Sequence, residues 1–237
     1  MNLNFKYENT LIEFEIKRSK RKTLQIQIDP TGNILVKVPQ KISQNRIIEL
    51  VQSKQKWIIK NLNKIKQIDF ESIKKKFVQG EKFLYLGNEY LLKIEKNNNV
   101  KIPVIQLNEN KLYIESNCES DEVISKYLIK WYKKMAQKII SERVKYYQKY
   151  FIEKPKLVKA KEQKRRWGTC TGINNLYFNW RIIMAPIEVI DYVVVHEMSH
   201  MPHKNHSKEF WNEVESILPQ YKEQKKWLKE NGIMLDV

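Results

Sequence analysis

Residues 193–206 read VVVHEMSHMPHKNH and contain all four histidines of this 237-residue chain. His196, Glu197 and His200 form the pattern H-E-x-x-H. On a helix, residues four apart lie on one face about a turn from each other, so both imidazoles can point at one metal ion. Glu197 is displaced around the helix and can reach a water beside that ion. The motif predicts one zinc ion on a helix, with Glu197 as general base.

A third histidine follows at the spacing that a catalytic zinc site needs. His206 comes six residues after His200, the H-E-x-x-H-x-x-x-x-x-H spacing of metzincins, and Pro202 favours a helix end between them. His203 stands where metzincins have glycine. The prediction is that His196, His200 and His206 hold the metal. The alternatives for the third ligand are His203 and a carboxylate of the following helix, Glu213 or Glu215.

The segments around the motif predict the elements that carry it. Pro186 opens the helix, and Val189, Val193 and Val194 form a face that buries it. Residues 176–182, LYFNWRI, alternate as a strand does, and a further helix is expected to begin at Ser207. In the loop RRWGTC, we expect Gly168 to make a tight turn. Arg166 is a candidate contact for a substrate carboxylate or a developing oxyanion.

The N-terminal half has a different pattern. Period-two alternation predicts strands at 11–19, 23–29 and 33–39, with a turn at Pro30–Gly32. Ser43 is expected to cap a helix that reaches residue 65 and uses Trp57 as a core anchor. Two hairpins follow, one around Gly87-Asn88 and one over 101–116, and then a long helix at 120–151.

These patterns together predict an α+β protein. We place a boundary near residue 117, between a β-rich region at 1–117 with one long helix and a catalytic region at 118–237. The chain has no long linker, so the two regions could also pack as one unit.

Composition narrows the partners. We expect a peptide or protein as the substrate. The formal net charge is +17, so the alternative partner is a nucleic acid that binds the basic surface. No apolar run is as long as a membrane span, and the N-terminus has no apolar signal segment, so we expect no membrane partner. Cys118 and Cys170 form no motif together, so we expect a reducing cytoplasm. The oligomeric state stays open.

Several stretches resemble the YgjP-like family of zinc metallopeptidases, relatives of SprT-like and WLM proteins. They are RRWGTC, NLYFNWRIIMAPIEVIDYVVVHEMSHMPHKNHSKEFW and YKEQKKWLKENG, and, less specifically, RSKRKTLQIQIDPTGNILVKVPQ and GEKFLYLGNEY. The resemblance covers nearly the whole chain. It implies a zincin-like catalytic fold, with His196, His200 and His206 as ligands and Glu197 as catalytic acid and base. Met198 stands where leucine is common in the family, a change that conserves volume.

Overall fold

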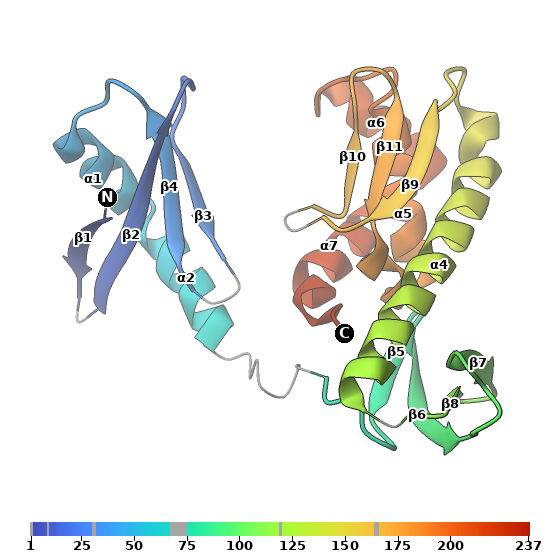
Figure 1. Cartoon of the computed structure of the whole chain (residues 1–237). Helices are drawn as coiled ribbons and strands as arrows, with labels where there is room; N and C mark the ends of the chain where they lie inside the picture. The colour runs from blue at the N-terminus through green and yellow to red at the C-terminus, as the bar shows by residue number, and fades with distance from the viewer. Residues whose placement is uncertain (1, 9, 30–31, 67–74, 119, 164–165) are drawn as a thin grey trace. The chain divides into compact units, whose positions relative to one another are not determined.

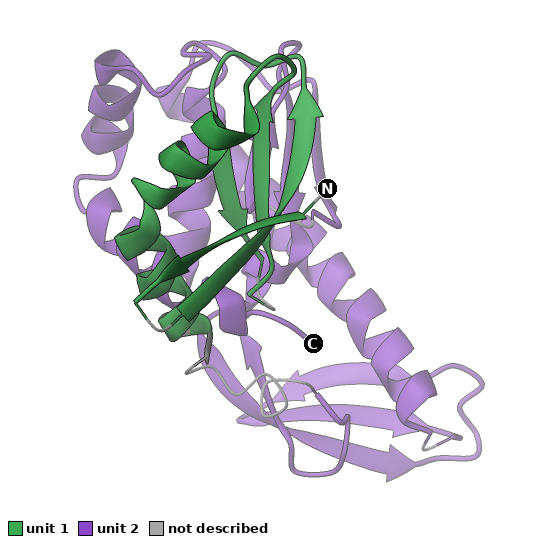
Figure 2. Ribbon diagram, turned by 90° about the vertical axis from the view of Figure 1, so that its left-hand side faces the viewer, with its two compact units in different colours: residues 1–72 green, residues 73–237 purple. Residues whose placement is uncertain are grey.

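A computed structural model describes residues 2–8, 10–29, 32–66, 75–118, 120–163 and 166–237. The chain forms two compact units, Met1–Ser72 and Ile73–Val237, which Figure 2 shows in green and purple. The boundary expected near residue 117 falls inside the second unit. The reason is packing, because the sheet that precedes residue 117 shares one hydrophobic core with the helix that follows it.

The first unit is a four-stranded sheet with two helices. Its strand order is β1-β2-β4-β3, where β2 and β4 run parallel and both outer pairs run antiparallel. Alternation along β2 buries Ile12, Phe14 and Ile16, as its sequence predicts. The bounds are β1 Asn2–Tyr7, β2 Thr10–Ser19, β3 Gln25–Ile28, β4 Ile34–Pro39, α1 Gln44–Gln52 and α2 Gln55–Lys66. Pro30 and Thr31 of the expected turn lie outside the described residues.

The helix expected from Ser43 to residue 65 is two helices. Ser43 caps α1 as predicted, because its Oγ accepts a hydrogen bond from the Arg46 backbone N–H at 3.3 Å. The break between α1 and α2 interrupts the helical periodicity, so residues after it need not continue the buried face of α1. The expectation for Trp57 was therefore wrong: its side chain is 46% exposed, and the neighbouring Ile58 is buried instead.

The second unit begins with another four-stranded sheet, of order β5-β6-β8-β7. Both hairpins predicted from the sequence are confirmed, and the first turns at Leu86 and Gly87, where both residues have positive φ. Backbone N–H groups of that turn donate to the carbonyls of Ile183 and Met184, just before the motif helix. The bounds are β5 Lys82–Tyr85, β6 Asn88–Lys96, β7 Val104–Asn108 and β8 Lys111–Ser116.

One long helix joins this sheet to a second one. Helix α4, Asp121–Tyr147, runs from the β5–β8 sheet to a three-stranded sheet of order β10-β11-β9 (Figure 1). Its buried residues repeat every four positions, from Ile124 to Val144, and they contribute to the core of the whole unit. The bounds are η1 Gln148–Tyr150, β9 Leu157–Lys161, β10 Gly168–Cys170, β11 Asn175–Asn179 and η2 Trp180–Met184.

The motif helix is α5, Ile187–Ser199, and it packs against α4, α6 and α7. Residues 189–195 are all buried, so the valine face is confirmed. Arg143 of α4 donates from Nε and Nη2 to the two carboxylate oxygens of Asp191, at 2.5 and 2.7 Å, and so fixes α5 along α4. The remaining bounds are α6 Lys208–Ile217, α7 Tyr221–Asn231 and η3 Gly232–Met234. Within the described residues, no helix combines the length and the hydropathy needed to cross a bilayer.

Candidate metal centre

Three histidines meet at the C-terminal end of α5. His196 lies in the last turn, His200 is the C-cap, and His206 lies in the connection to α6. One ring nitrogen from each lies within 4.8 Å of the others, and Nε2 of His196 is 3.1 Å from Nε2 of His206. Among the described residues this is the one group of histidine, cysteine or carboxylate side chains close enough to share a metal ion.

The protonation of these rings suits a cation. Nδ1 of His200 is 3.0 Å from the His203 carbonyl oxygen, which can only accept, so this contact favours the tautomer in which Nδ1 donates and Nε2 can bind a metal. Burial, followed by the charges of His200 and His206, lowers the pKa of His196 to about 3. Burial also lowers the pKa of His206. Neutral imidazoles are the form that binds metal, so this donor set fits a zinc ion.

Aromatic side chains of α6 and α7 support the histidines. The Phe210 ring lies 4.5 to 5.0 Å from all three imidazoles, centroid to centroid. Trp211 stacks on His206, with 5.6 Å between the ring centres and a 22° angle between the planes. Tyr221 stacks on Trp211, with 5.3 Å between the ring centres. Ser207 caps α6 through its Oγ, as predicted, and so starts the helix that carries Phe210 and Trp211.

Glu197 is the buried carboxylate beside the histidines, with 6% of its surface exposed. Burial raises its pKa to about 8, against the lowering effects of a backbone hydrogen bond from Cys170 and the positive charge of Arg166. Gly168 of β10 leaves room for it, because a Cβ at residue 168 would lie 2.6 Å from Glu197 Oε1. The expectation of a tight turn at Gly168 was wrong, because the residue lies in strand β10, where the absence of a side chain makes room for the carboxylate.

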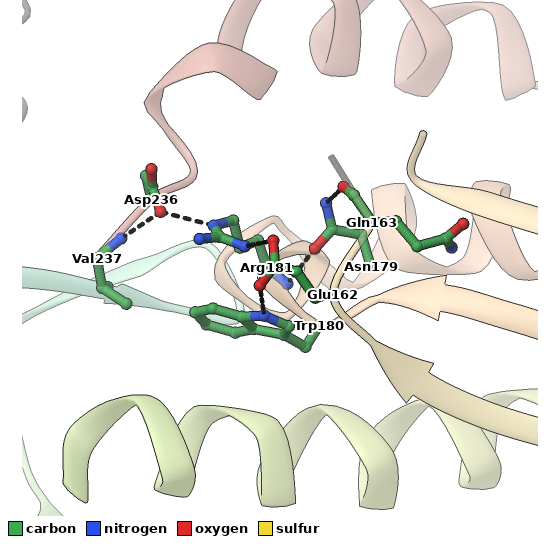
Figure 3. Close-up of polar contacts among 7 residues, drawn as sticks. All are labelled: Glu162, Gln163, Asn179, Trp180, Arg181, Asp236 and Val237. Carbon is green, nitrogen blue, oxygen red and sulfur yellow. Dashed lines mark hydrogen bonds and ion pairs between the residues drawn. The ribbon is translucent and has the colours of Figure 1, made fainter. Parts of the chain in front are cut away.

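Arg166 is exposed and lies in the loop between β9 and β10, two residues before Gly168. Polar contacts hold the loop at its start (Figure 3). Glu162 accepts hydrogen bonds from Trp180 Nε1 at 2.9 Å and from Arg181 at 2.5 Å, and Arg181 also donates to Asp236 near the C-terminus at 2.6 Å. The loop that presents Arg166 is thereby tied to the segment that follows β11.

A second pair of contacts holds the same loop on both sides of Arg166. Asn179 donates from Nδ2 to the Gln163 carbonyl at 2.9 Å, as Figure 3 shows, and from its backbone N–H to the Trp167 carbonyl at 2.8 Å. Gln163 in turn donates to the Tyr177 carbonyl at 3.0 Å. These residues could not be identified from the sequence, because hydrogen bonds across a sheet edge leave no periodic signal.

The alternative third ligands lie elsewhere. Glu213 contacts His203, with 3.8 Å between Oε2 and Nε2, and Glu215 pairs with Lys222 at 2.8 Å. His203 contacts His200 through its backbone carbonyl, and its ring is not part of the cluster. The structure therefore groups His206, and not these three residues, with His196 and His200.

A histidine cluster at the end of a buried helix, beside a buried glutamate, is an arrangement typical of metal-dependent hydrolases. A model of the YgjP-like metallopeptidase domain matches residues 22–231, so the chain belongs to the YgjP-like family. Its class is accordingly that of a metallopeptidase, with peptides or proteins as substrates. Comparisons with curated proteins and with solved structures find no match.

Proposed function

We propose that the protein is a zinc-dependent peptidase in which His196, His200 and His206 hold one zinc ion. The observation that carries the proposal is the approach of three ring nitrogens within 4.8 Å of one another, next to the buried Glu197. When bound, zinc would supply the Lewis acidity that polarises a peptide carbonyl and lowers the pKa of water. The family resemblance further supports a zincin-like catalytic fold for the α5 region.

Glu197 is the proton carrier in this proposal. A pKa of about 8 lies near neutral pH, so the carboxylate can take a proton from the attacking water and then donate it to the leaving amine nitrogen. The carboxylate faces β10, where the Cys170 backbone N–H stabilises the charged form. Arg166 lies beside this strand, where its guanidinium could orient a carboxylate or an oxyanion of the substrate.

The test is metal content and peptide cleavage of the wild type and of Glu197→Gln. We expect the variant to keep its metal and to lose activity by about 10²- to 10⁴-fold, the usual contribution of a general base. His206→Ala should lose metal, whereas His203→Ala should keep it, because the His203 backbone carbonyl remains on His200. A Glu197→Gln protein with full activity would contradict the mechanism.

Two further expectations stay proposals. Cys118 and Cys170 are both free thiols, which supports a reducing compartment such as the cytoplasm. The net charge of +17 supports a nucleic-acid partner as the alternative function. Binding of duplex DNA measured against salt would test that alternative, since counterion release predicts a steep loss of affinity.

A further inference from the structure

Three positively charged side chains come from the segments next to the histidine cluster and Glu197, and each comes from a different element. Arg166 lies in the loop before β10, Lys204 in the turn between His200 and His206, and Lys225 on α7. We call these three residues the cationic rim. All three are exposed, and within the described part of the chain none of them forms an ion pair with a carboxylate.

Local contacts hold two members of the rim in place. The Lys225 ammonium lies 4.0 Å from the centre of the Trp211 ring, and Trp211 stacks on His206. Lys204 donates from Nζ to Asn174 Oδ1 at 2.7 Å, which fixes it beside the turn between β10 and β11. The Lys225 ammonium is therefore held close to His206 and the Lys204 ammonium beside the β10–β11 turn, and among the described residues neither pairs with a carboxylate.

The third member is positioned by its loop. Arg166 stands two residues before Gly168, which contacts Glu197, and the hydrogen bonds of Asn179 to Gln163 and Trp167 fix the loop on both sides of it. Figure 3 shows the first of these hydrogen bonds. The guanidinium thus belongs to the side of the site where the catalytic carboxylate lies.

Carboxylates near the centre do not neutralise the rim. Glu197 is buried, and Glu213 is directed at His203. Glu209 is exposed, and hydrogen bonds with the Ser207 side chain and with its own backbone hold its carboxylate at the start of α6 and lower its pKa. Elsewhere on α7, Lys222 is paired with Glu215 at 2.8 Å. Within the described residues, none of these carboxylates forms an ion pair with a member of the rim.

We propose that the cationic rim selects peptide segments that carry acidic side chains on both sides of the bond to be cleaved. This inference rests on the proposed peptidase function, because the rim lies on segments next to that site and its ligand is then the peptidase substrate. A glutamate side chain reaches several ångströms from a peptide backbone, so carboxylates flanking the scissile bond can pair with Arg166 on one side and Lys225 or Lys204 on the other.

The expected selectivity is moderate, because each ion pair is exposed to water. One exposed pair changes an affinity by about two- to fivefold, and three pairs together by about ten- to a hundredfold. Such pairs weaken as salt is added, since the screening length falls to about 8 Å at physiological ionic strength. The rim should therefore act as a salt-sensitive filter on substrates.

The test measures binding to the full-length Glu197→Gln protein, which should not turn the probe over. The probes are a fluorescein-labelled peptide with glutamates on both sides of its centre and an otherwise identical peptide with glutamines. Fluorescence anisotropy at low and high salt should show the acidic peptide binding about tenfold more tightly at low salt, with a smaller difference at high salt. Arg166→Gln, Lys204→Gln and Lys225→Gln should each weaken only the acidic peptide, by about two- to fivefold.

Lys222→Gln is the matched control. It removes the same charge from α7, but its ammonium is already paired with Glu215, so peptide binding should not change. Equal affinity for the two peptides, or rim variants that behave like Lys222→Gln, would overturn the proposal. Rim variants that weaken duplex DNA binding without affecting the acidic peptide would also overturn it, and would assign the rim to nucleic acid.

Cleavage by the wild-type protein separates this proposal from the proposed function. A protein that cleaves both peptides at equal rates is a peptidase without the rim's selectivity, so only the further inference fails. A protein that prefers the acidic peptide in binding but cleaves neither peptide retains the selective surface, and in that case the proposed catalysis fails.

Discussion

The two four-stranded sheets of this protein have the same topology. In both, two antiparallel hairpins join through a parallel pair of strands, β2 with β4 in the first unit and β6 with β8 in the second. The parallel pairs even have the same separation along the chain, since Glu15 lies opposite Leu35 and Leu91 opposite Lys111. The sequence contains no repeat that would have indicated this.

The difference between the sheets is what they pack against. The first sheet closes over its own helices, so Val36, Ile47 and Val51 share a small separate core. The second sheet continues into the large core of α4 and α5, with Leu112 and Ile124 among its members. The same strand arrangement therefore has a core of its own in one unit and shares its core with the helix that carries the histidine cluster in the other.

Gly168→Ala should have the largest effect, a loss of peptidase activity. It tests whether that activity depends on Glu197 in the second unit. The added Cβ would lie 2.6 Å from Glu197 Oε1, so the carboxylate must move. A displacement of about 1 Å costs about 100-fold in rate, which should appear in kcat/KM for a peptide substrate. Gly172→Ala on the same hairpin meets nothing within 4 Å and should leave the rate unchanged. Wild-type activity in Gly168→Ala would contradict this account of Glu197.

A pair of core truncations tests whether the two sheets are independent. Ile12 and Ile114 are 1% and 0% exposed, one in each unit, and replacement by alanine should cost about 2–5 kcal/mol of stability in either. We expect Ile114→Ala to lower the temperature at which activity and metal are lost, and Ile12→Ala to lower only the melting of the first unit. Calorimetry with activity assays would check this, and equal loss of activity in both variants would show that the units unfold together.

A pair of glycines compares the turns of the two sheets. Gly87 and Gly32 have φ of +80° and +89°, so alanine at either costs about 1–2 kcal/mol. At Gly87 the new Cβ would also lie 2.9 Å from Pro186 Cα, before α5, whereas at Gly32 the nearest atom is Leu62 Cδ2 at 3.7 Å. We expect an additional penalty of about 1–3 kcal/mol for Gly87→Ala, with reduced activity. Urea denaturation of both variants measures the loss of stability. An equal loss in Gly32→Ala and Gly87→Ala would contradict the predicted additional cost at Gly87.

The pH dependence of the metal-free protein should show the smallest effect, confined to the second unit. The pKa of His196 is lowered to about 3, so the unfolded chain binds a proton that the folded chain does not, and the contribution of His196 to stability falls as pH falls from about 6.5 to about 3. The pKa of Glu197 is raised to about 8, so the contribution of Glu197 falls as pH rises from about 4.5 to about 8. The two contributions oppose each other between about pH 4.5 and 6.5, so stability should fall on the acidic side below about 4.5 and on the alkaline side above about 6.5.

Urea midpoints of chelator-treated protein, measured against pH, would check both limbs. Glu197→Gln should flatten the decline on the alkaline side, because the glutamine side chain does not titrate. Stability that rises steadily from pH 5 to pH 8 would contradict the assigned shift of Glu197.

The sequence by itself determined the features that depend on local geometry. Helical spacing put His196 and His200 on one face, and Ser43 and Ser207 predicted helix starts that the structure confirms. The hairpin around Gly87 and the strand that contains Leu176 and Phe178 were likewise predicted, because turn chemistry and alternation act over a few residues.

Only the tertiary structure decided what depends on packing between distant segments. It grouped His206 with the motif rather than Glu213, because the turn after α5 and the position of α6 set which side chain arrives there. It brought Gly168 against Glu197, and it exposed Trp57, which periodicity had placed in the core. It also moved the division of the chain from residue 117 to residue 72, because a helix joins whichever core buries its apolar face.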